Sequence, residues 1–547
     1  MSGQNSHTIQ PLKTDFTSYL AAGLSSILFI LLSLSLIPYA GIQEDEALFS
    51  IPLYQPAARE FRVRMFHHTF PIMVMTYVGT LKTLLYRPLI QWFGSSLWTV
   101  RLPVVLVGGA TVFVFYHLTR DVLTPSRGAT HAALAALAAA LLLATDPVFL
   151  LTNTFDWGPV ALEHALLVTG CFLVFRFATD QSQIRFLAAG FGCFGLAMWN
   201  KALFGWALSG LTAGALTVFW TEVKQCLTWR NVKVAGGAFL AGALPFVIYN
   251  IHASSATVRE NAHLETDRMP AKWLQLERAA DGSSLFGYMT SEDSDRPLKP
   301  PPTWRGRLAQ WIYQRVGERR ETGFFYVFGG MLALAPLWWR VRAARFSLVF
   351  LVVAWSMMAL TKNAGASAHH DILLWPFPLL FAACVLACIP WRWVAGLAAA
   401  AMLLMNLLVV NQYILQFERA GATGGFTDAT IALNRLLPED QTIYVTDWGM
   451  NATLQLTHQG RLHLFSAQAA LMGDAPNPDQ EAQLRTMLAD TSAIWLGHVT
   501  GREAFEGVNA HLEQFASKAG YQRELLRTVT DSNGRPVYEL FRFRPSA

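Results

Sequence analysis

Long apolar segments recur along the chain, and they constrain its fold more than any other feature. About eleven of them are long enough to cross a hydrocarbon layer about 30 Å thick, which takes about 20 residues of helix. They begin near residues 17, 103, 130, 159, 186, 202, 233, 323, 346, 371 and 393. Hydrophobic residues make up 53% of the chain and charged residues only 14%, whereas about a quarter of a soluble domain is charged. The sequence therefore predicts an all-α polytopic membrane domain.

The short loops between these segments predict how the chain crosses the membrane. If the N-terminus is cytoplasmic, every cytoplasmic loop is basic, as the positive-inside rule requires. These loops hold Arg120, Arg127, Arg176, Arg185, Lys224, Arg230, Lys233, Arg340, Arg342, Arg345 and Arg392. The long loops 42–102 and 252–322 then lie outside. The first apolar run is longer than the core of a signal peptide, so we expect it to remain as an anchor.

The five cysteines fall in apolar segments or in a cytoplasmic loop, so the outer loops have none for a disulfide. An alanine-rich outer surface without disulfides suggests a bacterial inner membrane. The net charge of +5 is largely accounted for by the cytoplasmic loops, and no nucleic-acid-binding motif is present. We therefore expect contact with membrane lipids and none with nucleic acid.

The composition changes after the glycine-rich junction "FERAGATGGFTD". We expect residues 1–418 to form the membrane domain and residues 419–547 a small periplasmic α/β domain. Segments 441–448 and 492–499 read as strands, 479–490 and 502–520 as helices, and 524–543 as a hairpin turning at residues 532–534. This domain contains no nucleotide fingerprint, nucleophile elbow or metal-ligand spacing, which favours a cap or an interaction module.

Acidic residues from two segments lie on the predicted outer side. Three adjacent carboxylates, residues 44–46, follow the first span, and Asp156 begins the fourth span. Glu163 lies seven residues after Asp156, on the same helix face and about 10 Å deeper. A carboxylate below the membrane surface is costly, so it normally faces a polar cavity or a partner. For Glu163 that partner could be the neighbouring His164.

Basic residues collect on the same side. They are His67, His68, Lys82, Arg87, Lys201, His369 and His370. Each alone can be explained as a contact with lipid headgroups. Their coincidence with the carboxylates, from at least four separate segments, predicts a polar crevice at the outer membrane surface.

A crevice with both acids and bases suits transfer from a lipid-borne donor. Nucleotides are not normally supplied at the outer face, and the chain has neither a P-loop nor a Rossmann glycine pattern. A sugar linked through phosphate to a polyprenyl chain would be available there. Its transfer needs a carboxylate to take the proton from the acceptor hydroxyl and cations to stabilise the leaving phosphate.

Five motifs in chain order carry a family resemblance. They are "QEDEALFS", "YVGTLKTLLYRPLIQWFGSSLWTVRLP", "DWGPVAL", "WNKALFGW" and "HHDILLWPFP". Over residues 15 to 415 the chain resembles the GT-C glycosyltransferases, the superfamily of protein O-mannosyltransferases and lipid A aminoarabinose transferases. Among them it looks most like the bacterial lipopolysaccharide-core galacturonosyltransferases. It departs from the mannose and aminoarabinose types by having His369-His370 where many members have Arg-Tyr.

The resemblance implies roles for these residues. Asp45 would be the general base, Glu46 would orient a cation or the sugar, and Asp156 would position the acceptor or a metal. Lys201, His369 and His370 would bind the donor phosphate, with Lys82 a weaker candidate. The secondary candidates are Glu44, Arg87, Glu163 and His68. No cofactor is required, although Glu44, Asp45, Asp156 and His68 could gather around a divalent cation such as Mg²⁺ or Mn²⁺.

The resulting hypothesis is an inverting glycosyltransferase that moves a sugar from a polyprenyl-phosphate donor to an envelope lipid, glycan or protein. The loop 252–322 would be an amphipathic surface helix and a lid over the donor. Two other functions stay open: a transporter or flippase for a lipid-linked sugar, and a non-catalytic membrane scaffold. The chain has no internal repeat, which disfavours a transporter. The sequence specifies neither the sugar nor the acceptor.

Overall fold

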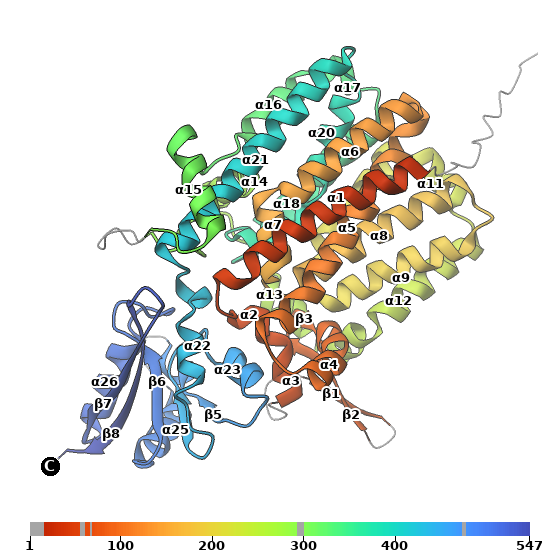
Figure 1. The fold of residues 1–547 in the computed structure, drawn as a ribbon. Helices are drawn as coiled ribbons and strands as arrows, with labels where there is room; N and C mark the ends of the chain where they lie inside the picture. The colour runs from red at the N-terminus through yellow and green to blue at the C-terminus, as the bar shows by residue number, and fades with distance from the viewer. Residues whose placement is uncertain (1–15, 55–60, 66–67, 293–299, 473–476, 547) are drawn as a thin grey trace, which may run out of the picture.

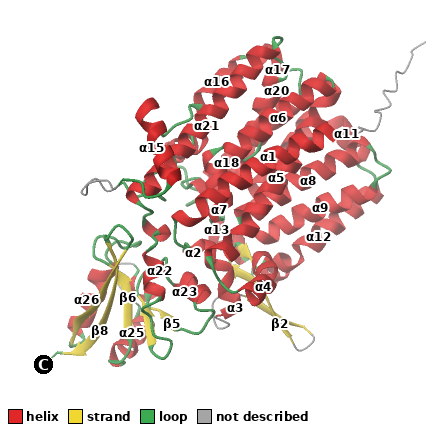
Figure 2. Ribbon diagram, viewed as in Figure 1, coloured by secondary structure: helices red, strands yellow, loops and turns green. Residues whose placement is uncertain are grey.

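The computed structural model describes residues 16–54, 61–65, 68–292, 300–472 and 477–546. A large bundle of helices holds most of the chain, and a sheet flanked by helices follows it at the C-terminus (Figures 1 and 2). Strands are confined to one end of the molecule, where the C-terminal sheet and the first long loop lie (Figure 2).

Six helices of the described residues are long and apolar enough to cross a membrane, and two bent helix pairs bring the number of spans to eight if each pair is one span. The six helices are α1 (Phe16–Leu36), α5 (Leu97–Arg127), α8 (Val160–Thr179), α12 (Trp229–His252), α18 (Arg342–Ala359) and α21 (Arg392–Ala420). The pairs are α6 (Ala129–Thr145) with α7 (Pro147–Phe155), and α19 (Ala368–Asp371) and η3 (Ile372–Leu374) with α20 (Phe377–Leu386).

The bend of 58° between α6 and α7 has a local cause. Pro147 has no backbone N–H to continue the helix, and the Asp146 side chain accepts a bond from the Phe149 N–H, which begins a new one. The Asp146 carboxylate also accepts a bond from the indole N–H of Trp375.

Each of the eleven predicted segments contains a helix, but the predicted number of spans is not confirmed. Three of these helices are short: α9 (Ile184–Asn200) has 17 residues, α10 (Phe204–Val218) has 15 and α16 (Phe324–Ala333) has 10. Of two further short helices, α11 (Trp220–Cys226) lies in a predicted cytoplasmic loop and α17 (Ala335–Trp338) lies at the end of the segment that begins near residue 323.

The two long loops are folded. Segment 42–102 contains α2 (Glu44–Ala47), η2 (Leu48–Ser50), α3 (Ile51–Tyr54), an antiparallel sheet of β1 (Phe61–Met65), β2 (His68–Met75) and β3 (Val78–Gly79), and α4 (Leu81–Phe93). Segment 252–322 contains α13 (Ala256–Asn261), α14 (Met269–Ala280) and α15 (Trp304–Val316). The helix α15 exposes Trp304, Leu308 and Trp311, as an amphipathic surface helix would. The small sheet is a feature that the sequence analysis did not predict.

The C-terminal sheet has the strand order β5-β4-β6-β8-β7. Its members are β4 (Thr442–Val445), β5 (His463–Ser466), β6 (Ile494–His498), β7 (Tyr521–Thr530) and β8 (Pro536–Pro545). The strands β5, β4 and β6 are parallel to one another. The strand β8 runs antiparallel to both of its neighbours, β6 and β7. The predicted strands 441–448 and 492–499 and the hairpin are present as β4, β6 and β7–β8, and β5 was not predicted.

Helices cover both faces of this sheet because successive strand residues point to opposite sides. Ile443 and Leu496 pack with α22 (Ala429–Asn434) and α23 (Asn451–Thr457). Trp495 packs on the other face, where α24 (Gln468–Leu471), α25 (Pro478–Ala489) and α26 (Val508–Lys518) lie. The result is a three-layer α/β domain.

The C-terminal domain and the first long loop lie at the same end of the helical bundle (Figure 1). There α23 packs directly against α2, the helix that carries the acidic triplet. The contact brings together segments about 400 residues apart in the chain, and it is where the candidate site residues lie.

Candidate active site

The acidic triplet is a short helix because Gln43 caps it. The Gln43 Oε1 accepts bonds from the backbone N–H groups of Asp45 (2.7 Å) and Glu46 (3.1 Å). In return the Gln43 N–H donates to the Glu46 carboxylate at 3.3 Å, which completes a capping box. The cap fixes the directions of the three carboxylates, which point to different sides of one helical turn.

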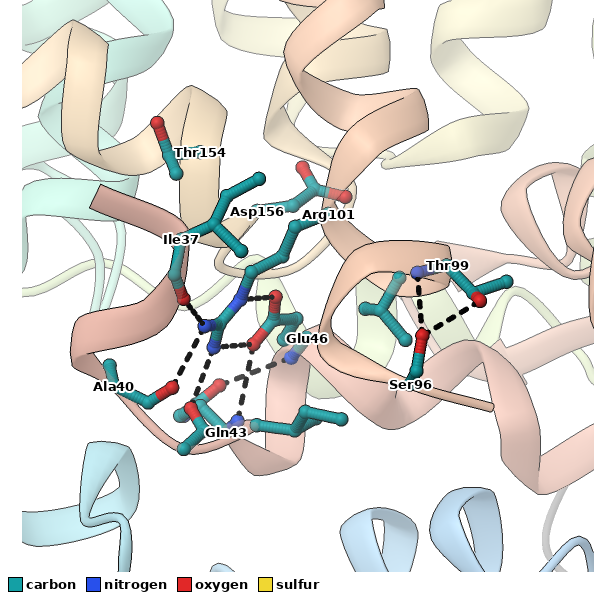
Figure 3. Close-up of polar contacts among 12 residues, drawn as sticks. Ile37, Ala40, Gln43, Glu46, Ser96, Thr99, Arg101, Thr154 and Asp156 are labelled. Atoms are coloured by element: carbon teal, nitrogen blue, oxygen red, sulfur yellow. Dashed lines mark hydrogen bonds and ion pairs between the residues drawn. The ribbon is translucent and has the colours of Figure 1, made fainter. Parts of the chain in front are cut away.

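Glu46 is bound by Arg101 of α5 (Figure 3). The guanidinium donates from Nε to Oε1 at 2.7 Å and from Nη2 to Oε2 at 2.8 Å, and both side chains are fully buried. Its other three bonds go to the carbonyls of Ile37, Ala40 and Gly41. Both carboxylate oxygens are thus held by this cation, and the buried side chain has no exposed surface to offer a sugar.

Asp45 is half-buried and has a different partner. The indole Nε1–H of Trp157 donates to Asp45 Oδ2 at 2.9 Å, and the Gln43 side-chain amide lies 3.5 Å from the same oxygen. Burial raises the pKa of the Asp45 carboxyl, while the Gln43 side chain, the Lys201 charge and the Trp157 bond partly lower it. The net direction is upward, which makes Asp45 a better proton acceptor than an exposed aspartate.

Trp157 is the centre of an aromatic cluster. Tyr288, from the loop between α14 and α15, stacks on it with ring centroids 4.3 Å apart, and His369 lies 4.6 Å away. Tyr288 remains 41% exposed, so the cluster has an accessible face. The sequence analysis missed both Trp157 and Tyr288, although the motif "DWGPVAL" contains the tryptophan next to Asp156.

Asp156 and Lys82 bind each other. The Lys82 Nζ lies 2.6 Å from Asp156 Oδ2 and also donates to the Glu46 carbonyl at 3.2 Å. The Ala161 N–H donates to the other Asp156 oxygen at 3.0 Å. Both side chains are buried. This arrangement corrects the expectation that Lys82 is available for a phosphate and Asp156 for an acceptor or a metal, because each neutralises the other.

A small pocket of about 10 Å³, which is about the room that one water molecule needs, lies beside these residues. Asp45 and Lys82 supply its charged groups. The other lining residues are Leu48, Phe49, Val74, Val78, Gly79 and Pro159. The β2–β3 hairpin therefore forms one wall of the pocket.

Lys201 lies at the end of α9, where its backbone bridges to Val78 of β3. Its side chain is buried, and its Nζ is 3.8 Å from the position that a Cβ on Gly158 would occupy. Within the described part of the chain, no hydrogen bond or ion pair engages this Nζ. Lys201 is thus a cation near Asp45 and Trp157 that is free to meet an anionic group.

Glu163 lies deeper and is paired differently than expected. Its Oε2 accepts a bond from the Asn200 side chain at 2.8 Å. The proposed partner His164 instead contacts Asn153 Oδ1 at 3.1 Å and the Ile372 carbonyl at 2.8 Å. The alternative of a Glu163–His164 pair is therefore wrong. Glu163 instead contacts Asn200, which directly precedes Lys201 in the chain.

The two adjacent histidines reach the same region from α19. Their rings are 4.1 Å apart, and His369 Nδ1 is 2.6 Å from the Ser367 hydroxyl oxygen. His370 meets the Trp206 ring edge-on at 6.0 Å, and its buried Nδ1 has no hydrogen-bond partner among the described residues. His369 thus lies beside the Trp157 cluster, with His370 next to it.

The secondary candidates do not form a metal site. Both Glu44 oxygens accept a bond from the Ala452 N–H at 2.9 Å, and Arg87 is exposed on α4. The side chain of His68 lies outside the described residues. Among the residues that the structure describes, no three His, Cys, Asp or Glu side chains gather as ligands. Glu44 and Asp156, two members of the set suggested for a divalent cation, are bound to other partners within the described part of the chain.

No protein-family model and no curated protein sequence matches the chain. Its fold is similar to that of solved structures. ArnT from Cupriavidus metallidurans bound to undecaprenyl phosphate has a TM-score of 0.54 at 13% identity, over 95% of this chain and 97% of that one. The apo state of the same ArnT gives a TM-score of 0.53 at 12% identity, with the same coverage.

An archaeal structure is also similar. The oligosaccharyltransferase from Archaeoglobus fulgidus, in complex with zinc and sulfate, has a TM-score of 0.50 at 13% identity, over 95% of this chain and 72% of that one. These structures belong to GT-C glycosyltransferases, the superfamily that the five sequence motifs resemble. The chain therefore has the GT-C glycosyltransferase fold, in a multi-pass membrane protein with a small C-terminal sheet domain.

Proposed function

We propose that this protein is an inverting glycosyltransferase of the inner membrane, which moves a sugar from a polyprenyl-phosphate donor to an envelope acceptor on the periplasmic side. The observation that carries the proposal is the meeting of Asp45 and Lys201 around Trp157 and Gly158. One is a half-buried carboxylate with a raised pKa, and the other is a buried cation without an ion-pair partner among the described residues. Transfer from a glycosyl phosphate needs one group of each kind.

Asp45 is the general base in this proposal. The acceptor hydroxyl gives its proton to the Asp45 carboxylate while its oxygen forms a bond to the anomeric carbon. The bond from that carbon to the phosphate oxygen breaks, and the polyprenyl phosphate leaves with the electron pair. Attack opposite the leaving group inverts the anomeric centre through a transition state with oxocarbenium character.

Lys201 stabilises the charge that develops on the leaving phosphate. A buried cation is effective there because the low local dielectric strengthens its interaction with an anion. The histidines of α19 complete the phosphate side, with His369 beside Trp157 and the unpartnered Nδ1 of His370 next to it. Lys82 and Asp156 support the pocket wall as an ion pair.

The ArnT structure contains undecaprenyl phosphate, which supports a donor of the same class here. The distribution of charge supports the orientation. Basic residues from separate predicted cytoplasmic loops come close to one another: Arg176 contacts Asp121 beside Arg120, and Arg392 contacts His131. This grouping supports a cytoplasmic end opposite α2 and the C-terminal domain.

The loop 252–322 supplies the lid in this proposal. Tyr288 reaches Trp157 from that loop and remains partly exposed. A donor sugar placed between Asp45 and Lys201 would contact this ring, so binding of the donor should order the loop. Equal protease cleavage of the loop with and without a polyprenyl-phosphate lipid would contradict this role.

The test uses a deletion strain. Mass spectrometry of its envelope glycolipids and glycoproteins should show the loss of one sugar residue, and its membrane lipid extract should retain both unused donor and unmodified lipid or glycan acceptor. Purified protein added to that extract in liposomes should restore the missing mass, and NMR of the product should show the inverted anomer. An unchanged envelope together with no product in the liposomes would refute the proposal.

A further inference from the structure

The segment 41–50, which carries Asp45, is bonded to the C-terminal region at several points. The Gly41 N–H donates to the Phe426 carbonyl at 2.8 Å, and the Thr453 hydroxyl donates to the Ile42 carbonyl at 3.2 Å. The Ser50 hydroxyl donates to the Ala452 carbonyl at 3.1 Å. A Cβ at Gly41 would collide with the Thr427 carbonyl oxygen, so the two backbone segments lie so close that only a glycine fits at position 41.

Glu44 makes the contact nearest to Asp45. Both of its carboxylate oxygens lie 2.9 Å from the Ala452 nitrogen, in the first turn of α23. The side chain is only 9% exposed, so the bond is made away from water. A hydrogen bond made away from water is electrostatically stronger than one at the surface, because the local dielectric is low.

The same helical turn is held from the opposite side by Arg101, which binds Glu46. Asp45 lies between these two attachments, and its own backbone N–H is bonded to Gln43 Oε1. Gln43 is in turn close to the C-terminal domain, because Gly425 lies against both its side chain and the Trp448 ring. The direction of the Asp45 carboxylate therefore depends on one attachment to the membrane domain and one to the C-terminal domain.

We propose that Glu44 is a positioning residue through which the C-terminal domain holds Asp45 in its catalytic direction. The inference rests on the proposed function, since it assigns the domain a part in that same site. The C-terminal domain is then a structural half of the active site and not an independent module. A displacement of about 1 Å at a reacting group can cost about 100-fold in rate, so loss of this attachment should reduce turnover.

The experiment compares Glu44→Ala with Glu439→Ala in the full-length protein. Glu439 is a carboxylate of the same domain whose described partners are Arg461 and His458, the latter at the opposite end of α23 from Ala452. Transfer is measured in liposomes made with the lipid extract of the deletion strain. We expect Glu44→Ala to lower kcat by about 10- to 100-fold with KM for the donor within about twofold, and Glu439→Ala to leave both unchanged.

Hydrogen–deuterium exchange of residues 42–48 provides the readout that does not depend on activity. Exchange there should rise in Glu44→Ala and stay as in the wild type in Glu439→Ala. Glu44→Gln keeps an oxygen that accepts from Ala452, so it should recover part of both kcat and protection. If Glu44→Ala does not fold, Thr453→Val, which removes only the bond to the Ile42 carbonyl, replaces it with the same expected directions.

Wild-type kcat and unchanged exchange in Glu44→Ala, or in its replacement, would overturn the inference while leaving the proposed function intact. A wild-type protein that transfers no sugar would instead overturn the proposed function, and the exchange data would still decide whether Glu44 holds the segment.

Discussion

Lys82 Nζ lies 2.6 Å from Asp156 Oδ2, and both side chains are buried beneath the loop that carries Asp45. Replacing Lys82 with methionine leaves a buried carboxylate without its cation, so we expect the free energy of unfolding to fall by about 3–5 kcal/mol. Thermal unfolding in detergent, followed by circular dichroism, measures the change. Neutralising both partners in Lys82→Met/Asp156→Asn should recover much of the loss, and a double variant as unstable as the single one would contradict the pairing.

Lys201 should behave in the opposite way, because no described residue forms an ion pair with it. Lys201→Met breaks no direct ion pair of the described residues and only weakens longer-range interactions with Glu163, Asp45 and Asp156, so stability should change much less than in Lys82→Met while transfer falls by about 100-fold or more. The two lysine variants, assayed together for melting temperature and for turnover, separate a structural cation from a functional one. Lys201→Met with wild-type turnover would exclude Lys201 from the phosphate side.

Asp45→Asn should lower kcat by about 10²- to 10⁴-fold, the usual contribution of a general base, without altering the melting temperature. The amide keeps the shape of the side chain and can still accept the Trp157 N–H. The exposed Arg87→Ala variant, in the same outer loop, is the matched control and should retain full turnover. A folded Asp45→Asn protein with most of its transfer rate would remove Asp45 from the mechanism.

Some elements and residues of this site could be predicted from the sequence, and others could not. The apolar segments and the strands β4 and β6 could be predicted because hydrophobic periodicity is local. The acidic triplet could be singled out because three charges beside a membrane span are unusual. The partners could not be predicted: Asp156 lies 74 residues from Lys82 and 112 residues separate Asp45 from Trp157, and one sequence does not tell which distant residues meet.

Arg101 illustrates the same limit. The sequence analysis contains it only as a letter of the motif "YVGTLKTLLYRPLIQWFGSSLWTVRLP" and assigns it no role. In the structure its five bonds all go to residues 37–46, and it is fully buried. Glu46 is therefore held in the protein interior, and its neighbour Asp45 faces Trp157. Adjacent and chemically similar carboxylates can be told apart only by what surrounds them.

The surroundings of Glu44 predict a pH dependence of stability. Burial raises its pKa from 4.5 to about 7, against the bonds from Ala452 and Thr453. In the unfolded chain Glu44 ionises at its ordinary pKa, so the stability that it contributes is fully present below about pH 4.5 and is lost as the pH rises to about 7. A shift of this size corresponds to about 3 kcal/mol. The unfolding free energy of the wild type should fall relative to Glu44→Gln over this range, and parallel curves for the two proteins would contradict the prediction.

The bond from Trp157 to Asp45 predicts a shift in the pH profile of activity. Burial sets the raised pKa of Asp45, and the Trp157 N–H and the Lys201 charge both lower it. The base acts in its ionised form, so kcat/KM rises with pH through this pKa. Trp157→Phe keeps a ring to stack on Tyr288 but removes the N–H, so the acidic limb of the pH profile should move to higher pH.

Trp157→Phe should also lose about tenfold in rate at neutral pH, since Asp45 is less firmly oriented. Tyr288→Phe keeps the ring stacked on Trp157 and does not touch the N–H, so its acidic limb should match the wild type. A Trp157→Phe profile superimposable on the wild-type profile would mean that this hydrogen bond does not act on the base.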